Sequence, residues 1–164
     1  MTKHLLLIRH AKSDWSNEDL TDFDRPLNNR GHKDAPAMAE RLLKNRLVPQ
    51  HLISSPAKRA ITTAKYFADV FQINKNLIQQ EEDIYEASSS ILLKVINRID
   101  DRYGFVALFG HNPALTSVVI DLSNADISDI PTCGMALIKF TFDDWAMISN
   151  GTGKLQFFDY PKNS

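Results

Sequence analysis

Apolar residues gather in short runs along the chain, separated by polar segments. Residues 5–8 form one such run, residues 52–53 a second and residues 105–109 a third, with a weaker run at 77–80. These runs are too short for a surface helix, and their apolar residues are consecutive rather than spaced. Strands that are buried on both faces of a parallel sheet have this pattern. We therefore expect buried, mostly parallel strands at these positions.

Between these runs, apolar residues recur at helical spacing. After Pro56 they mark one face of a helix, and a second amphipathic helix is expected over residues 88–102, where serines are available to cap its start. A third helix is expected to begin at Pro113 and to run to about residue 122. The apolar positions that predict the first two helices are Ala60, Ala64, Phe67, Phe71, Leu92, Val95, Ile96 and Ile99.

The earliest helix has two possible starts. Residues 12–26 are polar and acidic without a period, which predicts a loop before it. Asn28 can cap the helix that follows, which would place Pro36 inside it as a kink. Alternatively Asp34 is the cap and Pro36 lies in the first turn. The residue pattern leaves both starts open.

The alternation of strands and helices predicts the fold class. It favours an α/β fold in three layers, with a mostly parallel central sheet and helices on both faces. Residues 135–142 and 154–160 have strand character and are joined by a segment containing Asn150-Gly151, which predicts an antiparallel hairpin at one edge near the C-terminus. With 164 residues and no linker or repeat, we expect one domain over residues 1–164.

Composition and charge restrict the classes of partner. The chain is 43% hydrophobic with a net charge of −1, so neither nucleic acid nor a membrane surface is an expected partner. Cys133 is the one cysteine, which excludes an internal disulfide and fits a reducing compartment. Residues 1–4 lack the features of a signal peptide, and no run approaches the ~20 apolar residues of a membrane span. We expect a cytoplasmic protein.

Histidine and arginine side chains follow the predicted strands directly. Arg9 and His10 end the first strand, Arg59 lies just after the second, and His111 follows the strand at 105–109. Ligands of open α/β sheets bind beyond the carboxyl ends of the strands, so these side chains are expected to meet there. Guanidinium groups match phosphate oxygens and stabilise the charge of a transferring phosphoryl group. The pattern predicts a phosphoryl-binding pocket.

His10 is the predicted nucleophile, which would form a covalent phosphohistidine that water hydrolyses. It must attack as the neutral imidazole, so its other ring nitrogen needs a hydrogen-bond acceptor, such as a backbone carbonyl, to fix the tautomer. Backbone N–H groups at the start of the helix after Pro113 are expected to add positive potential. The expected reaction uses no metal and no cofactor.

A metal centre built on His10 and His111 is the sharper rival interpretation. Arg9 and Arg59 would repel a cation, and no carboxylate has ligand spacing with either histidine. The sequence therefore favours an anion site over a metal site.

Two other phosphatase chemistries fit the residues less well. A cysteine phosphatase needs an arginine six residues after its thiolate, and here Lys139 stands at that distance from Cys133, inside a predicted strand. An aspartyl phosphatase needs acids directly after a buried strand, whereas Asp22 and Asp24 lie in a polar segment. We expect Cys133 in the core and the two acids in a solvated loop.

Three segments resemble the motifs of the histidine phosphatase superfamily, which includes the cofactor-dependent phosphoglycerate mutases. The match covers positions 5 to about 120 in the family's order. The compact length, the Arg-His-Ala form of the first motif and residues 24–27 (Asp-Arg-Pro-Leu) resemble the SixA-type phosphohistidine phosphatase branch. The three segments are residues 7–13 (Leu-Ile-Arg-His-Ala-Lys-Ser), 54–64 (Ser-Ser-Pro-Ala-Lys-Arg-Ala-Ile-Thr-Thr-Ala) and 110–113 (Gly-His-Asn-Pro).

This resemblance implies a set of roles at the strand ends. It implies a nucleophile, three residues of a phosphate pocket, and further residues near its rim as candidates for substrate binding. It also implies that the first helix begins soon after Leu27, which favours Pro36 as an internal kink. The implied nucleophile is His10, and the implied phosphate pocket consists of Arg9, Arg59 and His111. The candidates for substrate binding are Ser13, Arg25 and Asn112.

The general acid is where the chain departs from larger members of the superfamily. Those proteins carry a Glu or Asp after the second helix, and Glu86 occupies roughly that region. SixA-type enzymes resemble their relatives poorly here, and a phosphoramidate substrate has a nitrogen leaving group whose demands differ from those of an alkoxide. Glu86 is the candidate acid; the other interpretation is a surface or helix-start charge.

The sequence thus predicts a metal-independent phosphatase that acts through phospho-His10, with protein phosphohistidine as the substrate that the branch implies. An alternative keeps the pocket but takes small phosphate monoesters or acyl phosphates. A mutase fits less well, because re-donating a phosphoryl group favours a closed site and the chain has few residues for a lid. From another class, a non-catalytic module that binds phosphate or phosphopeptide stays open.

Overall fold

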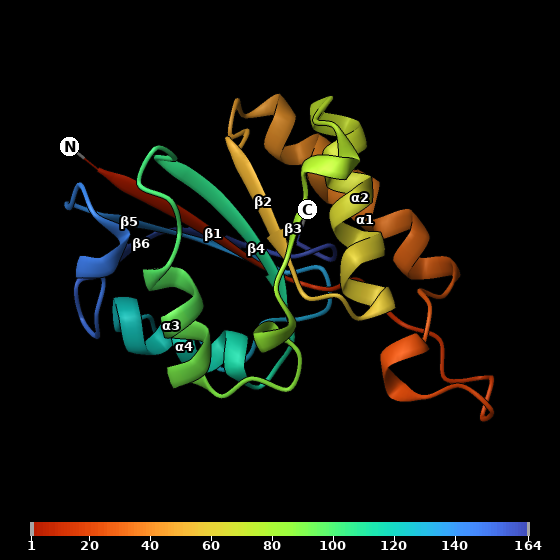
Figure 1. The fold of residues 1–164 in the computed structure, drawn as a ribbon. Coiled ribbons are helices and arrows are strands. Elements are labelled where there is room, and N and C mark those ends of the chain that lie inside the picture. The colour runs from red at the N-terminus through yellow and green to blue at the C-terminus, as the bar shows by residue number, and fades with distance from the viewer. Residues whose placement is uncertain (1, 164) are drawn as a thin grey trace.

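A six-stranded sheet forms the centre of the computed structural model, which describes residues 2–163 (Figure 1). The strand order across the sheet is β3-β2-β4-β1-β5-β6. The strands from β3 to β1 are parallel, whereas β5 is antiparallel to β1 and to β6. The strands span Lys3–Arg9 (β1), His51–Ser54 (β2), Gln79–Gln80 (β3), Phe105–Gly110 (β4), Met135–Phe140 (β5) and Gly153–Asp159 (β6).

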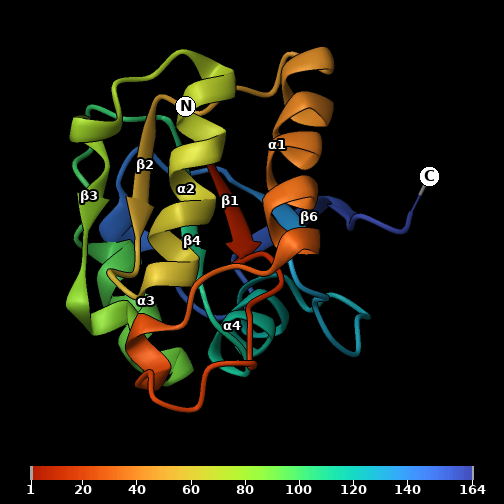
Figure 2. The same cartoon turned by 90° about the vertical axis from the view of Figure 1, so that its right-hand side faces the viewer.

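Helices cover both faces of this sheet. Helices α1 and α2 pack on one face, and α3 and α4 pack on the other (Figures 1 and 2). The predicted three-layer α/β fold, mostly parallel with an antiparallel edge near the C-terminus, is confirmed. The helices span Asn29–Lys44 (α1), Lys58–Phe71 (α2), Ser89–Asn97 (α3) and Ala114–Ser123 (α4).

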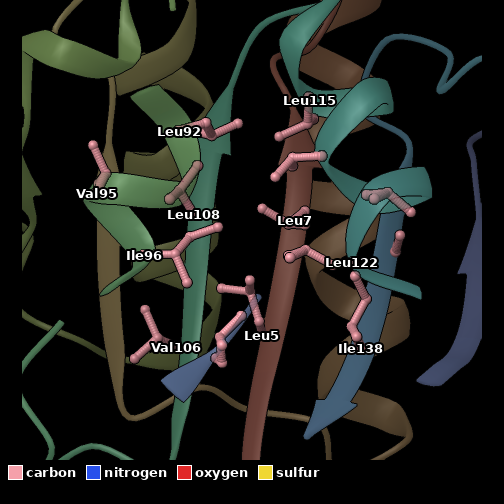
Figure 3. Close-up of a cluster of buried hydrophobic side chains, with 14 of the residues drawn as sticks. Leu5, Leu7, Leu92, Val95, Ile96, Val106, Leu108, Leu115, Leu122 and Ile138 are labelled. Atoms are coloured by element: carbon pink, nitrogen blue, oxygen red, sulfur yellow. The ribbon is translucent and has the colours of Figure 1, made fainter. Parts of the chain in front are cut away.

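Strand β1 shows how the sequence directs both faces of the sheet. Leu5 and Leu7 belong to the apolar cluster beneath α3 and α4, whereas Leu6 and Ile8 belong to the cluster beneath α1 and α2. Side chains alternate across a strand, so a strand covered on both faces needs a continuous apolar run. Figure 3 shows the first cluster, with Leu115 of α4 lying over this strand. Each of these fully buried side chains contributes about 1.5–3 kcal/mol.

Helix α1 begins directly after Asn28, so the first of the two possible starts is the observed one. The Asn28 side chain accepts a hydrogen bond from the Gly31 N–H at 2.9 Å, which satisfies one of the free donors of the first turn. Pro36 lies inside the helix, as the family resemblance implied.

The C-terminal half differs from the prediction at the end of one helix and in one connection. Helix α3 stops at Asn97 rather than near residue 102, because the chain then turns and the Asp100 carboxylate accepts a hydrogen bond from the Arg102 N–H. The connection from β5 to β6 is longer than a tight turn, since it contains a 3-10 turn at Trp145–Met147 whose first residue is fully buried. The antiparallel pairing of β5 with β6 at the sheet edge is as predicted.

The loop of residues 12–26 passes beyond the carboxyl ends of the strands, below the arrowheads of β1 and β2 in Figure 2. It contains one 3-10 turn, Asp22–Asp24, and its residue Ser13 forms an isolated bridge with Leu27. The loop therefore lies where the sequence placed the candidate site. Among the helices formed by residues 2–163, none has both the length and the apolar character that crossing a membrane requires.

Candidate active site

One pocket of about 370 Å³ lies at the carboxyl ends of β1 and β4 and the start of α2. It brings together the four residues that the sequence predicted to converge and the three predicted for substrate binding. Four of the lining residues are Lys or Arg and none is an acid, so the pocket suits an anion. The lining consists of Arg9, His10, Lys12, Ser13, Trp15, Arg25, Arg59, His111, Asn112 and Thr132.

The backbone of His10 is held from both sides. Its N–H donates to the Gly110 carbonyl at 3.1 Å, and its carbonyl accepts from the Cys133 N–H at 3.0 Å. The next N–H, of Ala11, donates to the hydroxyl of Thr63 on α2 at 3.0 Å. The candidate nucleophile is therefore fixed by β4, by the segment before β5 and by α2.

The imidazole of His10 is buried and has a fixed tautomer. Nδ1 lies 2.8 Å from the Ala11 carbonyl oxygen, which can only accept, so Nδ1 carries the proton and Nε2 keeps its lone pair. This is the backbone acceptor that the sequence required but did not name. Burial, which outweighs the hydrogen bond to Ala11 and acts together with the nearby charges of His111, Arg59 and Arg9, lowers the pKa of His10 to about 3. The ring is neutral near pH 7.

His111 faces this ring from the end of β4. The two ring centroids are 5.1 Å apart. Nε2 of His111 lies 2.8 Å from the Ser55 hydroxyl just after β2, whereas Nδ1 is buried and has no hydrogen-bond partner within residues 2–163. Burial and then the charge of Arg59 lower the pKa of His111 to about 4. A buried nitrogen without a partner is a candidate contact for a bound anion.

Arg9 and Arg59 are oriented by carbonyl oxygens. Nη1 of Arg9 donates to the Ile130 carbonyl at 2.9 Å, and Nη1 of Arg59 donates to the Asp22 carbonyl at 2.7 Å. The Nε of each arginine is buried and unpaired among the described residues. Thr63 links Arg59 to the segment of the candidate nucleophile. Its hydroxyl accepts a hydrogen bond from the Ala11 N–H and donates one to the Arg59 carbonyl at 2.7 Å.

Asp22 joins two pocket arginines, a role that the sequence analysis missed by treating it as a solvated loop acid. Its Oδ1 accepts from Arg25 Nε at 3.2 Å, and its Oδ2 accepts from Arg59 Nη2 at 3.0 Å and from the Tyr85 hydroxyl at 2.7 Å. Although partial burial raises it, these hydrogen bonds and the charge of Arg59 lower the pKa of Asp22 to about 2. The carboxylate is therefore ionised at neutral pH.

Arg25 and Ser13 line the pocket, and both side chains are buried. Nη1 of Arg25 donates to the Ser13 hydroxyl. The indole of Trp15 stacks on the same guanidinium, with the guanidinium carbon 3.4 Å from the ring centre. Trp15 is 73% exposed, so this side of the pocket is open to solvent.

Asn112 lines the pocket, but the protein already uses its side chain. The amide nitrogen donates to the Ile130 carbonyl and to the Asp129 carboxylate, both at 2.9 Å. The amide oxygen accepts from the Thr116 N–H at 3.1 Å. These bonds hold the 129–130 segment against α4, and a substrate contact of Asn112 stays a prediction.

The start of α4 offers fewer free donors than the sequence suggested. The N–H of Leu115 donates to the His111 carbonyl at 3.0 Å, and the N–H of Thr116 donates to the Asn112 side chain. Both groups are occupied, the first by a backbone carbonyl and the second by the side-chain oxygen of Asn112. Neither N–H can contact an anion in this arrangement.

Glu86 does not line the pocket, and its side chain is exposed. Its neighbour Tyr85 reaches the site instead, through the hydroxyl bonded to Asp22. Burial, the bond and charge of Asp22, and the charge of Glu86 raise the pKa of Tyr85 to about 12, so this hydroxyl stays a donor. The role of Glu86 as general acid stays a prediction.

Cys133 lies in the core, as expected. It is fully buried, and burial raises the pKa of its thiol above the usual range, which opposes formation of a thiolate. Among residues 2–163, no three side chains of His, Cys, Asp or Glu gather closely enough to hold a metal ion.

Comparison with known proteins now defines the class. The sequence model of the histidine phosphatase superfamily (branch 1) matches residues 5–92, which is more than half of the chain. The chain therefore belongs to the histidine phosphatase superfamily. Within the superfamily it falls in the SixA-type branch: an Agrobacterium tumefaciens structure assigned as the phosphohistidine phosphatase SixA matches with a TM-score of 0.82 at 27% identity, covering 97% of this chain and 98% of that one.

Two of the relatives found by sequence show how far the likeness extends. An uncharacterized chloroplastic protein of Arabidopsis thaliana is 29% identical over 177 residues, covering 100% of this chain and 80% of that protein. A 2,3-bisphosphoglycerate-dependent phosphoglycerate mutase of Arthrobacter sp. (strain FB24) is 38% identical over 71 residues, 42% of this chain and 29% of the mutase. The likeness to the Agrobacterium structure and to the Arabidopsis protein thus covers nearly all of this chain, whereas the likeness to the mutase covers less than half of it. Together the comparisons support phosphatase activity.

Proposed function

We propose that the chain is a metal-independent phosphatase that forms a covalent intermediate on His10 and acts on protein phosphohistidine. The observation that carries the mechanism is the bond from His10 Nδ1 to the Ala11 carbonyl, which leaves Nε2 unprotonated inside a pocket of cations. A histidine nucleophile needs this tautomer and a neutral ring.

The reaction has two steps. Nε2 of His10 attacks the phosphorus, the bond between phosphorus and the substrate's nitrogen breaks, and the departing imidazole takes a proton from solvent. Water then attacks the phosphohistidine, the bond between phosphorus and Nε2 breaks, and inorganic phosphate leaves. Arg9, Arg59 and His111 hold the phosphoryl oxygens in both steps.

The substrate assignment rests on two features of this chain. The structure resembles a protein assigned as a phosphohistidine phosphatase over nearly its whole length. The pocket also opens to solvent beside the exposed Trp15, which suits a phosphoryl group carried on a protein surface. An imidazole leaving group is readily protonated, so the exposed position of Glu86 is compatible with this substrate.

We further propose that residues 1–164 work as one domain in the cytoplasm. The two apolar clusters flank a single sheet, which supports one domain. A single buried cysteine suits a reducing compartment.

The test compares His10→Ala with the native chain on a ³²P-labelled phosphohistidine protein. We expect the native chain to release phosphate in EDTA and to yield a labelled intermediate after a rapid quench that avoids acid. The variant should lose at least about 10³-fold in kcat/KM and show no label. Activity that survives in the variant, or that disappears with the chelator, would discard the mechanism. A higher kcat/KM on small phosphate monoesters than on phosphohistidine would reassign the substrate.

A further inference from the structure

A second pocket, of about 320 Å³, adjoins the candidate active site. The two pockets share Lys12 and Thr132, so a molecule whose phosphoryl group lies beside His10 can extend into the second pocket without leaving the surface. The second pocket is lined by Lys12, Arg30, Asp34, Pro131, Thr132, Tyr160, Pro161 and Lys162.

The charge of this pocket is positive, although the chain as a whole carries −1. It contains the cations of Lys12, Arg30 and Lys162 and one carboxylate, Asp34. That carboxylate is already paired with Arg30, at 3.3 Å from its Nε. Within residues 2–163 the ammonium groups of Lys12 and Lys162 have neither an ion pair nor a hydrogen bond. A local excess of cations on a chain whose net charge is close to zero attracts anions to this pocket rather than to the surface in general.

One wall of the pocket is fixed by the start of α1. The Asn28 N–H donates to the Lys12 carbonyl at 3.0 Å. Gly31 packs so closely on the same residue that a Cβ at this position would clash with the Lys12 carbonyl oxygen. Only glycine allows this approach, and the approach sets Arg30 beside Lys12.

The opposite wall is the segment after β6, which Arg41 holds in place. Its guanidinium donates to the carbonyls of Tyr160 at 3.0 Å, Pro161 at 2.8 Å and Asn163 at 2.8 Å. It also pairs with the Asp159 carboxylate at 3.2 Å. Charge-assisted bonds to three carbonyls of the segment give it a defined path. The wall that carries Lys162 is therefore preformed.

We propose that the second pocket binds an anionic group that the substrate carries beside its phosphoryl group, and that this group is the carboxylate of an acidic protein segment flanking the phosphohistidine. The proposal rests on the proposed function for its choice of a protein substrate. Thr132 and Tyr160 also line this pocket, and their hydroxyls are donors from which a carboxylate can accept. The second pocket would thus select acidic substrates, while the first performs the chemistry.

The experiment uses two phosphohistidine peptides of equal length, one with Asp and Glu around the histidine and one with Asn and Gln. We expect the native chain to prefer the acidic peptide. In Lys162→Glu and in Arg30→Gln the ratio of kcat/KM for the acidic over the neutral peptide should fall about three- to tenfold. Lys44→Glu changes the same kind of charge on an exposed residue of α1 outside both pockets and should keep the native ratio. An unchanged ratio in both pocket variants would overturn the proposal.

A binding measurement separates this proposal from the proposed function. Calorimetric titration with the acidic peptide before phosphorylation needs no catalysis, and we expect weaker binding by Lys162→Glu than by Lys44→Glu. If neither phosphopeptide is hydrolysed while this difference persists, the proposed function fails and the second pocket stands. Equal binding by the two variants overturns the pocket. The same titration is made with fructose 1,6-bisphosphate and fructose 6-phosphate. If Lys162→Glu weakens binding of the bisphosphate more than that of the monophosphate, but leaves binding of the acidic peptide unchanged, the ligand of the second pocket is not a protein segment.

Discussion

Two regions supply the candidate active site, and they are held by different means. At the strand ends, His10 and His111 continue buried strands, and the His10 backbone is bonded to its neighbours on both sides. In the loop of residues 12–26, the exposed Trp15 and the buried Arg25 are held by stacking and by side-chain bonds rather than by a strand ladder. Backbone ladders over a packed core allow little movement, whereas side-chain bonds to a carboxylate that is half-exposed, as Asp22 is, are screened by solvent and contribute less each. We expect the strand ends to determine the rate of the chemical step and the loop to adjust binding.

The largest effect is expected for Arg9→Ala at the strand end. Arg9 is oriented by the Ile130 carbonyl and contributes a guanidinium directly to the pocket, so its loss removes charge stabilisation from the transferring phosphoryl group. We expect kcat/KM on phosphohistidine to fall about 10²- to 10³-fold, mostly in kcat. Arg102→Ala, which alters an exposed arginine far from the pocket, is the control. A loss below about tenfold would remove Arg9 from the proposed mechanism.

The strand ends were also the part of the site that the sequence could predict. Short apolar runs mark strands, and the polar residue after each run lies at a known edge of the sheet. Arg9, His10 and His111 therefore follow from local pattern and topology. Ser55 lies in the second motif, yet its bond to His111 depends on the side-by-side position of β2 and β4.

The second prediction concerns how the buried His10 and the half-buried His111 make the stability of the protein depend on acid pH. Their pKa values are about 3 and about 4 in the folded chain, against an ordinary value of 6.5. Below pH 6.5 the unfolded chain binds more protons at these histidines than the folded chain does. Their contribution to the free energy of unfolding is therefore fully present above pH 6.5 and is lost as the pH falls toward 4. We expect a loss on the order of 1 kcal/mol per pH unit for each histidine, measured by urea unfolding between about pH 7.5 and 5.

Variants identify the source of this loss. In His10→Gln the free energy of unfolding should depend less steeply on pH than in the native chain. His32→Gln, at an exposed position on α1, should keep the native slope. Asp22 in the loop acts in another window: its pKa is lowered from 3.8 to about 2, so its contribution is present above pH 3.8 and is lost only as the pH falls toward 2. Equal slopes for both histidine variants would contradict the assignment.

Asp22→Asn should have a smaller effect on activity, because it acts through other residues. Losing the carboxylate weakens its bonds to Arg25 and Arg59, while the bond from Arg59 to the Asp22 carbonyl remains. We expect kcat/KM to fall about three- to tenfold, mainly through KM. Asp24→Asn, in the same 3-10 turn, is the matched control and should stay near the native value. A change confined to kcat would contradict a positioning role.

This carboxylate also shows what the sequence could not provide. Asp22 lies in a polar stretch without a period, and its partner Tyr85 is 63 residues away. The pairing depends on how the loop crosses the strand ends, which is a property of the assembled chain rather than of either segment. Only the distance of three residues between Asp22 and Arg25 is a local signal, and such pairs are common on exposed turns. For the same reason, the cationic walls formed by α1 and by the segment after β6 were not predicted.

The smallest effect is expected for Trp15→Leu, at the exposed end of the loop. The indole lies over the Arg25 guanidinium, and stacking of this kind at an exposed site contributes about 0.5–1 kcal/mol. Arg25 keeps its bonds to Asp22 and Ser13, so it loses only part of its support. We expect KM to rise about two- to threefold with kcat unchanged, and Trp15→Phe to recover most of the loss because it retains an aromatic face. If Trp15→Leu lowered kcat as strongly as Arg9→Ala does, the loop would take part in the chemical step, and the division between a catalytic strand end and an adjusting loop would be wrong.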